Sequence, residues 1–150
     1  MMPHSSSLRA ACALCLLICE VSFAQRFSFK HYGPDEGLTT AVNRLLQDRE
    51  GFLWVGTANG LYRYDGERFL RFGIADGLPA LSITLMHQSV DGTLWVVTSR
   101  GLARMRHNRF ERVTTVLPEK PESLFGFDSD QKGRLYLGST SGLQSGERWI

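Results

Sequence analysis

The sequence predicts an all-β protein made of repeated four-stranded units. Residues 51–69 recur 41 positions later as residues 92–110, and ten of the nineteen positions are identical. A looser third copy begins another 41 positions on, at Gly133. Four antiparallel strands in about 40–45 residues are typical of one β-propeller blade. We therefore predict three blades of an incomplete propeller, over about 38–72, 78–113 and 119–150.

The first unit shows how each strand is expected to form. An alternating segment over 42–48 ends at a turn that contains Gly51, and residues 52–57 are rich in types that favour a pleated sheet. The turn signals Asn59-Gly60 and Asp65-Gly66 then separate strands over 61–64 and 69–72. Residues 52–57 are apolar on both faces, as expected where a neighbouring blade covers each side.

A further strand is expected over 27–32, because Phe29 and Tyr32 match Phe69 and Phe72 of the first unit. Three blades cannot close a ring, since propellers have about 4–8. We expect residues 27–32 to join the last blade of a complete ring and close it. The sequence is accordingly expected to be the N-terminal portion of a longer protein or a truncated product, with the remaining blades as its partners.

Residues 1–24 are expected to be a cleaved signal peptide. Arg9 precedes an apolar segment that is too short to cross a bilayer as a helix, and Ser22-Phe23-Ala24 provides a cleavage site. A buried core helix or a lipoprotein site at Cys19 are the alternatives, although Ile18 stands where a lipoprotein site needs a small residue. Residues 25–150 then form an exported, periplasmic partial propeller without cysteine, because all three cysteines lie in the leader.

Composition excludes several classes of partner. The chain is 43% hydrophobic and 21% charged, as in a globular protein, and its net charge of +2 gives no argument for nucleic acid. We expect no membrane span from residue 25 onward and no cofactor.

Residues that recur in register are expected to be structural. Trp54 and Trp95 occupy one position in successive units, and Tyr136 replaces them in the third. A ligand site needs unlike groups that converge, so these rings are interpreted as packing between blades. Thr57 and Thr98, beside the turns, are expected to bond backbone groups.

Neither a metal site nor a catalytic site is expected. The histidines that follow the leader occupy unrelated positions of the repeat, and no carboxylate pair accompanies them. The aspartates that precede turn glycines are ordinary turn residues, and no calcium loop is present. The side chains considered were His31, His87, His107, Asp48, Asp91, Asp128 and Asp130.

Four side chains are weak candidates for ligand binding. Arg63 and Arg104 share one position in adjacent units and suit an anionic contact, although a salt bridge between blades or a solvated sheet edge is the simpler interpretation. Asn59 and Arg100 lie in turns that are expected on one rim, where loop residues differ between units.

The segment DREGFLWVGTANGLYRYDG, Asp48 to Gly66, resembles the two-component regulator propeller repeat. The resemblance extends over 27–150, with departures at Val97, Arg100 and Tyr136. It implies an exported sensor region of seven-bladed rings, followed by a membrane span and a cytoplasmic histidine kinase or diguanylate cyclase domain.

The sequence thus favours a non-enzymatic, ligand-sensing propeller module of an inner-membrane signalling protein. An unidentified small molecule or a glycan is the expected ligand, and a homodimer is the expected assembly. An exported propeller enzyme, such as a lyase or glycan-acting hydrolase, and a plain protein-interaction propeller are the alternatives.

Overall fold

The computed structural model describes residues 28–114, 120 and 123–146. The expected signal peptide (1–24) and the expected last strand of the third unit, around Trp149, lie outside these residues. The chain divides into two compact units, Met1–His31 and Tyr32–Ile150, and the fold described below belongs to the second. In the first unit, the described residues 28–31 form neither strand nor helix.

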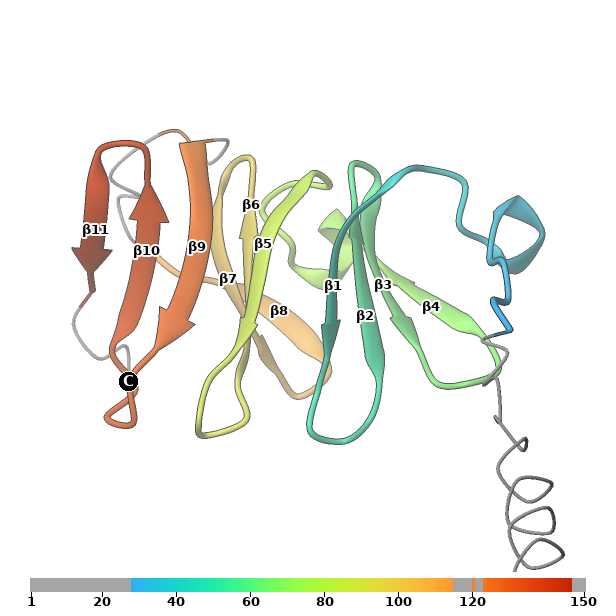
Figure 1. The fold of residues 1–150 in the computed structure, drawn as a ribbon, viewed down its shortest axis with the longest axis horizontal. Coiled ribbons are helices and arrows are strands. Elements are labelled where there is room, and N and C mark those ends of the chain that lie inside the picture. The colour runs from blue at the N-terminus through green and yellow to red at the C-terminus, as the bar shows by residue number, and fades with distance from the viewer. Residues whose placement is uncertain (1–27, 115–119, 121–122, 147–150) are drawn as a thin grey trace, which may run out of the picture. The chain divides into compact units, whose positions relative to one another are not determined.

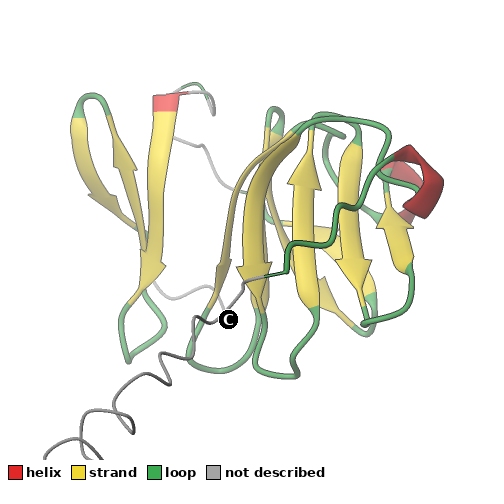
Figure 2. Cartoon of the chain, turned by 45° about the vertical axis from the view of Figure 1, so that its right-hand side comes forward, coloured by secondary structure: helices red, strands yellow, loops and turns green. Residues whose placement is uncertain are grey.

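The second unit consists of short strands joined by tight turns (Figures 1 and 2). The strands expected in the first unit are confirmed, with shifts of one residue at some ends. The strands are β1 (Val42–Gln47), β2 (Leu53–Thr57), β3 (Gly60–Tyr64), β4 (Phe69–Phe72), β5 (Ile83–Gln88), β6 (Leu94–Thr98), β7 (Gly101–Arg106), β8 (Arg109–Arg112), β9 (Leu124–Ser129), β10 (Leu135–Ser139) and β11 (Gly142–Ser145).

The strands form three antiparallel sheets in which neighbours along the chain pair with each other. Blade 1 has the order β1-β2-β3-β4, and blade 2 has the order β5-β6-β7-β8. Blade 3 has the order β9-β10-β11 in the described residues. These sheets confirm the predicted all-β propeller blades.

The first strand of every blade is irregular at the same place. Its pairing with the second strand shifts at Asn43 in blade 1, at Thr84 in blade 2 and at Phe125 in blade 3. These positions are 41 residues apart, so the bulge is part of the repeat. A bulge bends and twists its strand locally, and each blade is therefore bent in the same way beside its neighbour.

A short 3-10 helix precedes each of the first two blades, at the similar segments DEGL (35–38) and ADGL (75–78). These helices are η1 (Pro34–Glu36) and η2 (Ile74–Asp76). The backbone N–H of Gly33 donates to Glu36 Oε2 at 2.7 Å, and that of Gly73 donates to Asp76 Oδ2 at 2.8 Å. The acidic residue of each segment therefore fixes the loop that leads into the next blade.

The core consists of apolar layers between the sheets. One layer joins blades 1 and 2, and a second joins blades 2 and 3. In β2, Trp54 belongs to the first layer, whereas Val55 belongs to a cluster with Leu38 and Tyr62. Both faces of β2 are buried, which confirms the prediction made for residues 52–57. Both faces of β6 in blade 2 are buried as well.

The expected ring-closing strand stays a prediction. Residue 27 lies outside the described residues, and residues 28–32 form no strand here. Tyr32 instead packs its ring edge-on against Tyr64 and Phe69 of blade 1. Among the described residues, no helix has the length and apolar character needed to cross a bilayer.

Candidate functional site

The recurrent aromatic residues lie in the layers between blades. Trp54 and Trp95 are 3% and 4% exposed. Trp54 belongs to the apolar layer between blades 1 and 2, and Trp95 belongs to the layer between blades 2 and 3. A ring buried to this extent offers no open face for a ligand to stack on. Their interpretation as packing residues is confirmed.

Each of these aromatic residues donates one hydrogen bond to the turn that follows the first strand. Trp54 Nε1 donates to Asp48 Oδ2 at 2.7 Å, and Tyr136 OH donates to Asp130 Oδ2 at 3.3 Å. In blade 2, Trp95 Nε1 donates to Ser89 Oγ at 3.1 Å, and Asp91 accepts a hydrogen bond from Ser89. A polar tip that is buried needs such a partner.

The threonines beside the turns bond the backbone, as expected. Thr57 Oγ1 donates to the carbonyl of Gly60 at 2.9 Å and accepts from the N–H of Asn59 at 3.0 Å. Thr98 bonds Gly101 and Arg100 in the same way. Both threonines are fully buried, so their hydroxyls hold the turns rather than contact a substrate.

His87 lies between blades 2 and 3. Its Nε2 is 2.8 Å from Ser129 Oγ and 3.7 Å from Asp128 Oδ1, and its ring is 5.5 Å from that of Phe127. Desolvation by burial lowers the pKa of His87, and the charge of Asp128 opposes this effect. In the part of the chain that the structure describes, no three His, Cys, Asp or Glu side chains are grouped to hold a metal ion.

The four candidate ligand residues occupy opposite ends of the strands. Asn59 and Arg100 lie in the turns after β2 and β6, which we term the Asn59 rim. Arg63 and Arg104 lie toward the other ends, because they pair with Trp54 and Trp95 near the starts of β2 and β6. The structure therefore does not bring these four side chains together, and ligand binding by them stays a prediction.

On the Asn59 rim, an arginine of the fourth strand holds each turn. Arg71 donates to the carbonyl of Asn59 at 2.7 and 3.1 Å and to its side-chain oxygen at 3.2 Å. Arg112, 41 residues later, donates to the carbonyl of Arg100 at 3.2 Å. Each contact fastens a turn to the outermost strand of its own blade.

Arg63 and Arg104 are equivalent in sequence but have different neighbours. Arg104 lies 3.4 Å from Glu111 Oε2, and Arg106 also approaches this oxygen, at 3.8 Å. The guanidinium of Arg63 lies 4.7 Å from the centroid of the Phe52 ring, and its Nη1 donates to Asn108 Oδ1 at 3.3 Å. Arg63 makes no ion pair with any described residue.

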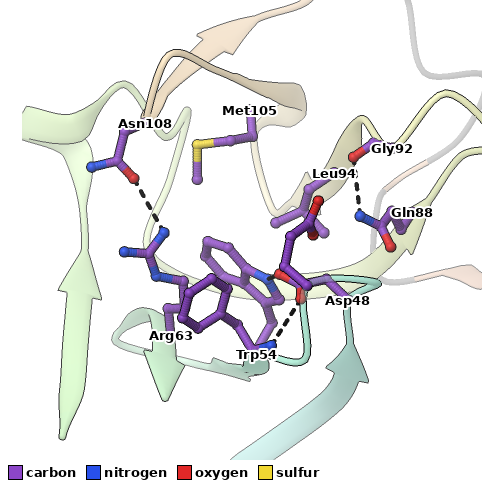
Figure 3. A pocket seen from close by; sticks show the side chains of 10 residues that line it. Asp48, Trp54, Arg63, Gln88, Gly92, Leu94, Met105 and Asn108 are labelled. Atoms are coloured by element: carbon purple, nitrogen blue, oxygen red, sulfur yellow. Dashed lines mark hydrogen bonds between the residues drawn. The ribbon is translucent and has the colours of Figure 1, made fainter. Parts of the chain in front are cut away.

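A cavity of about 260 Å³ lies beside Arg63, between blades 1 and 2. It is near the turns 48–52 and 89–93, on what we term the Gly51 rim. Figure 3 shows Trp54 at its base, with Arg63 and Asn108 on one side and Asp48 and Gln88 on the other. The lining residues are Asp48, Glu50, Phe52, Trp54, Arg63, Gln88, Gly92, Leu94, Met105 and Asn108.

Sequence reasoning identified Arg63 as a ligand candidate but missed most of this lining. Glu50, Gln88, Leu94, Met105 and Asn108 come from four separate segments that approach only when two blades pack. The repeat did contain one signal for the site, because blade 1 has Leu70 at the position where blade 2 has the acidic Glu111. Glu111 pairs with Arg104 across β7 and β8, whereas Leu70 pairs with Arg63 across β3 and β4.

These repeated sheets, with shared apolar layers between them, are blades of a β-propeller. Residues 37–59 match the family model described as "Two component regulator propeller", so the resemblance seen in the sequence is confirmed. A stretch of 44 residues is 46% identical to part of histidine kinase P4 from Formosa agariphila, and it covers 29% of this chain and 3% of that protein.

Two solved structures share the fold. The extracellular domain of BT3049 from B. thetaiotaomicron, named as a hybrid two component system, superposes with a TM-score of 0.63 at 20% identity. The extracellular domain of BT4673 from the same organism gives a TM-score of 0.61 at 20% identity. The matches cover 81% and 83% of this chain but only 18% and 20% of those chains.

Proposed function

We propose that this chain is the exported, ligand-sensing propeller region of a transmembrane two-component-type signalling protein. The observation that carries the proposal is the repeat itself. Residues 37–59, within its first unit, match the two-component regulator propeller model, and the blades superpose on extracellular domains named as parts of such systems. The apolar segment and cleavage motif of residues 1–24 agree with export.

The blades supply a scaffold for sensing rather than for catalysis. Their recurrent polar side chains, such as Asp48, Ser89 and Thr57, are occupied by bonds inside the fold. A sensor needs only a ligand with different affinities for two states of the protein. We propose that ligand capture between blades shifts the geometry of a homodimer joined through the inner membrane, and that a cytoplasmic output domain responds.

The natural gene provides the first test. We expect the coding sequence to continue beyond residue 150 into further blades, a membrane span and a histidine kinase or diguanylate cyclase domain. An open reading frame that lacks any span and any output domain would refute the signalling role.

Export is tested separately by fusing residues 1–40 to alkaline phosphatase, which is active only outside the cytoplasm. We expect activity from this fusion. The control carries Leu16→Arg and Leu17→Arg, which place two charges in the apolar segment and should abolish export. Equal activity of the two fusions would contradict a signal peptide.

A further inference from the structure

We propose that the cavity between blades 1 and 2 binds a small zwitterion of the α-amino acid class. Arg63 would bind its carboxylate, Glu50 its ammonium group, and the apolar side chain would lie on the partly buried Met105. This inference rests on the sensing function proposed above and names the ligand class for it.

Arg63 lacks the carboxylate partner that its equivalent in blade 2 has. Arg63 corresponds to Arg104, which has Glu111 as its carboxylate partner. At the position of Glu111, blade 1 has Leu70, so Arg63 lacks that partner. A half-buried guanidinium beside an aromatic ring and without a carboxylate is suited to bind the carboxylate of a ligand.

The carboxylate of Glu50 also lacks the partners that its equivalent in blade 2 has. Glu50 corresponds to Asp91, whose carboxylate accepts hydrogen bonds from Ser89 and from the backbone N–H of Thr93. Glu50 has no hydrogen-bond or ion-pair partner among the described residues, although it lines the cavity. The other carboxylate there, Asp48, already accepts from Trp54 and Phe52 through its two oxygens. Glu50 is therefore the acid available to a cation.

The cavity is held open by contacts between the blades. Near the first strands, the N–H of Arg49 donates to Gln88 Oε1 at 3.0 Å, and its guanidinium donates to the carbonyl of Val90. On the other side, Arg63 is joined to Asn108 of the β7–β8 turn at 3.3 Å. Walls fixed in this way are formed before a ligand arrives, which lowers the entropic cost of binding.

The size and the surfaces of the cavity select against other ligands. Its volume of about 260 Å³ is just below the range of roughly 300–1,000 Å³ for drug-sized molecules, which fits a ligand the size of a free amino acid. Stacking of a sugar is disfavoured, because Trp54 is buried and the guanidinium of Arg63 covers Phe52. A polyanion would be repelled by Asp48 and Glu50.

Isothermal titration calorimetry of the full natural chain with each of the twenty free L-amino acids tests the proposal. We expect at least one with an apolar side chain to bind. Arg63→Gln and Glu50→Gln should each weaken this binding about tenfold or more, since each removes a charge-assisted contact. Arg68→Gln and Glu67→Gln, in the exposed β3–β4 turn of the same blade, should leave it unchanged.

Single-charge analogues provide the second arm. If leucine binds, 4-methylpentanoate lacks its ammonium group, and 3-methylbutylamine lacks its carboxylate. We expect both to bind at least about tenfold more weakly than leucine. The proposal is overturned if no amino acid binds, if the Arg63 and Glu50 variants bind normally, or if either analogue matches its parent. None of these results bears on the gene-sequence and export tests, so the two proposals fail separately.

Discussion

The indole of Trp54 donates a hydrogen bond to Asp48 across 2.7 Å, and this bond joins the core of blade 1 to the turn after β1. The other oxygen of Asp48 accepts from the N–H of Phe52 at 2.8 Å. One carboxylate thus satisfies a buried side-chain donor and a backbone donor. Blade 3 repeats the arrangement with Asp130, whereas blade 2 uses Ser89.

Replacement of Asp48 by alanine should therefore destabilise the propeller. Two donors lose their acceptor, and each unpaired buried donor costs about 1–3 kcal/mol. We expect the free energy of unfolding to fall by about 2–4 kcal/mol, measured by urea denaturation of the full natural chain. Glu67→Ala, at an exposed turn position of the same blade, should change it by less than about 0.5 kcal/mol. Equal effects of the two substitutions would show that the Trp54–Asp48 bond contributes nothing.

Gly77 should tolerate no side chain. Its φ is +96°, and a Cβ atom at this position would lie 1.9 Å from the carbonyl oxygen of Phe110. Gly77→Ala thus combines a left-handed backbone, at about 1–2 kcal/mol, with steric overlap, at about 1–3 kcal/mol. Gly66→Ala is the matched control, because its φ is +104° but its Cβ would meet no atom within 4 Å.

The two glycine variants separate conformation from packing. We expect Gly66→Ala to cost only the conformational part, about 1–2 kcal/mol, and Gly77→Ala to cost both parts, about 2–5 kcal/mol. Thermal melts of the two variants and the parent measure the difference. Similar melting temperatures for both variants would mean that the loop at Gly77 can move away from β8.

The blades could be predicted from the sequence because their determinants are local and repeated. A spacing of 41 residues, turn signals such as Asp65-Gly66 and the apolar strand 52–57 are each visible without any knowledge of contacts. The same spacing indicated that Trp54 packs between blades and does not stack on a ligand. The recurrent bulge at Asn43 was not predicted, because it depends on how two strands align rather than on a residue pattern.

The cavity could not be predicted in the same way. Its walls come from two blades, and its chemistry depends on an ion pair that is absent from blade 1. In blade 2, Glu111 lies opposite Arg104, whereas in blade 1 Leu70 lies opposite Arg63. The repeat shows that Leu70 and Glu111 are equivalent, but the strand register is needed to show that they face Arg63 and Arg104. The turn residue Asn59 accepts hydrogen bonds from Arg71. This turn lies at the opposite end of the strands from Arg63.

The stability of blade 3 should decrease at low pH through Asp130. The N–H of Arg134, its guanidinium and the N–H of Lys132 donate to this carboxylate, which lowers its pKa from 3.8 to about 2. The native state therefore binds the proton less readily than the unfolded chain, and the stabilisation is complete above pH 3.8. It should be lost as the pH falls from 3.8 toward 2.

Carboxyl NMR of the full natural chain should place the titration of Asp130 near pH 2. In Asp130→Asn, the decrease in stability between pH 4 and 2 should be smaller than in the parent. A midpoint near 3.8 for Asp130 would show that the bonds from Arg134 and Lys132 do not persist in solution.

A polypeptide of residues 25–150 alone should aggregate or fold poorly. Leu45, Phe125 and Leu143 are 63%, 60% and 73% exposed, although they lie on strands of blades 1 and 3. Exposed apolar side chains on sheet strands promote association between chains. We expect size-exclusion chromatography to show oligomers or aggregates, and the triple variant Leu45→Lys, Phe125→Lys and Leu143→Lys to be more soluble. A sharp cooperative melt of monomeric 25–150 would contradict this expectation, because it would show that three blades bury enough apolar surface to fold alone.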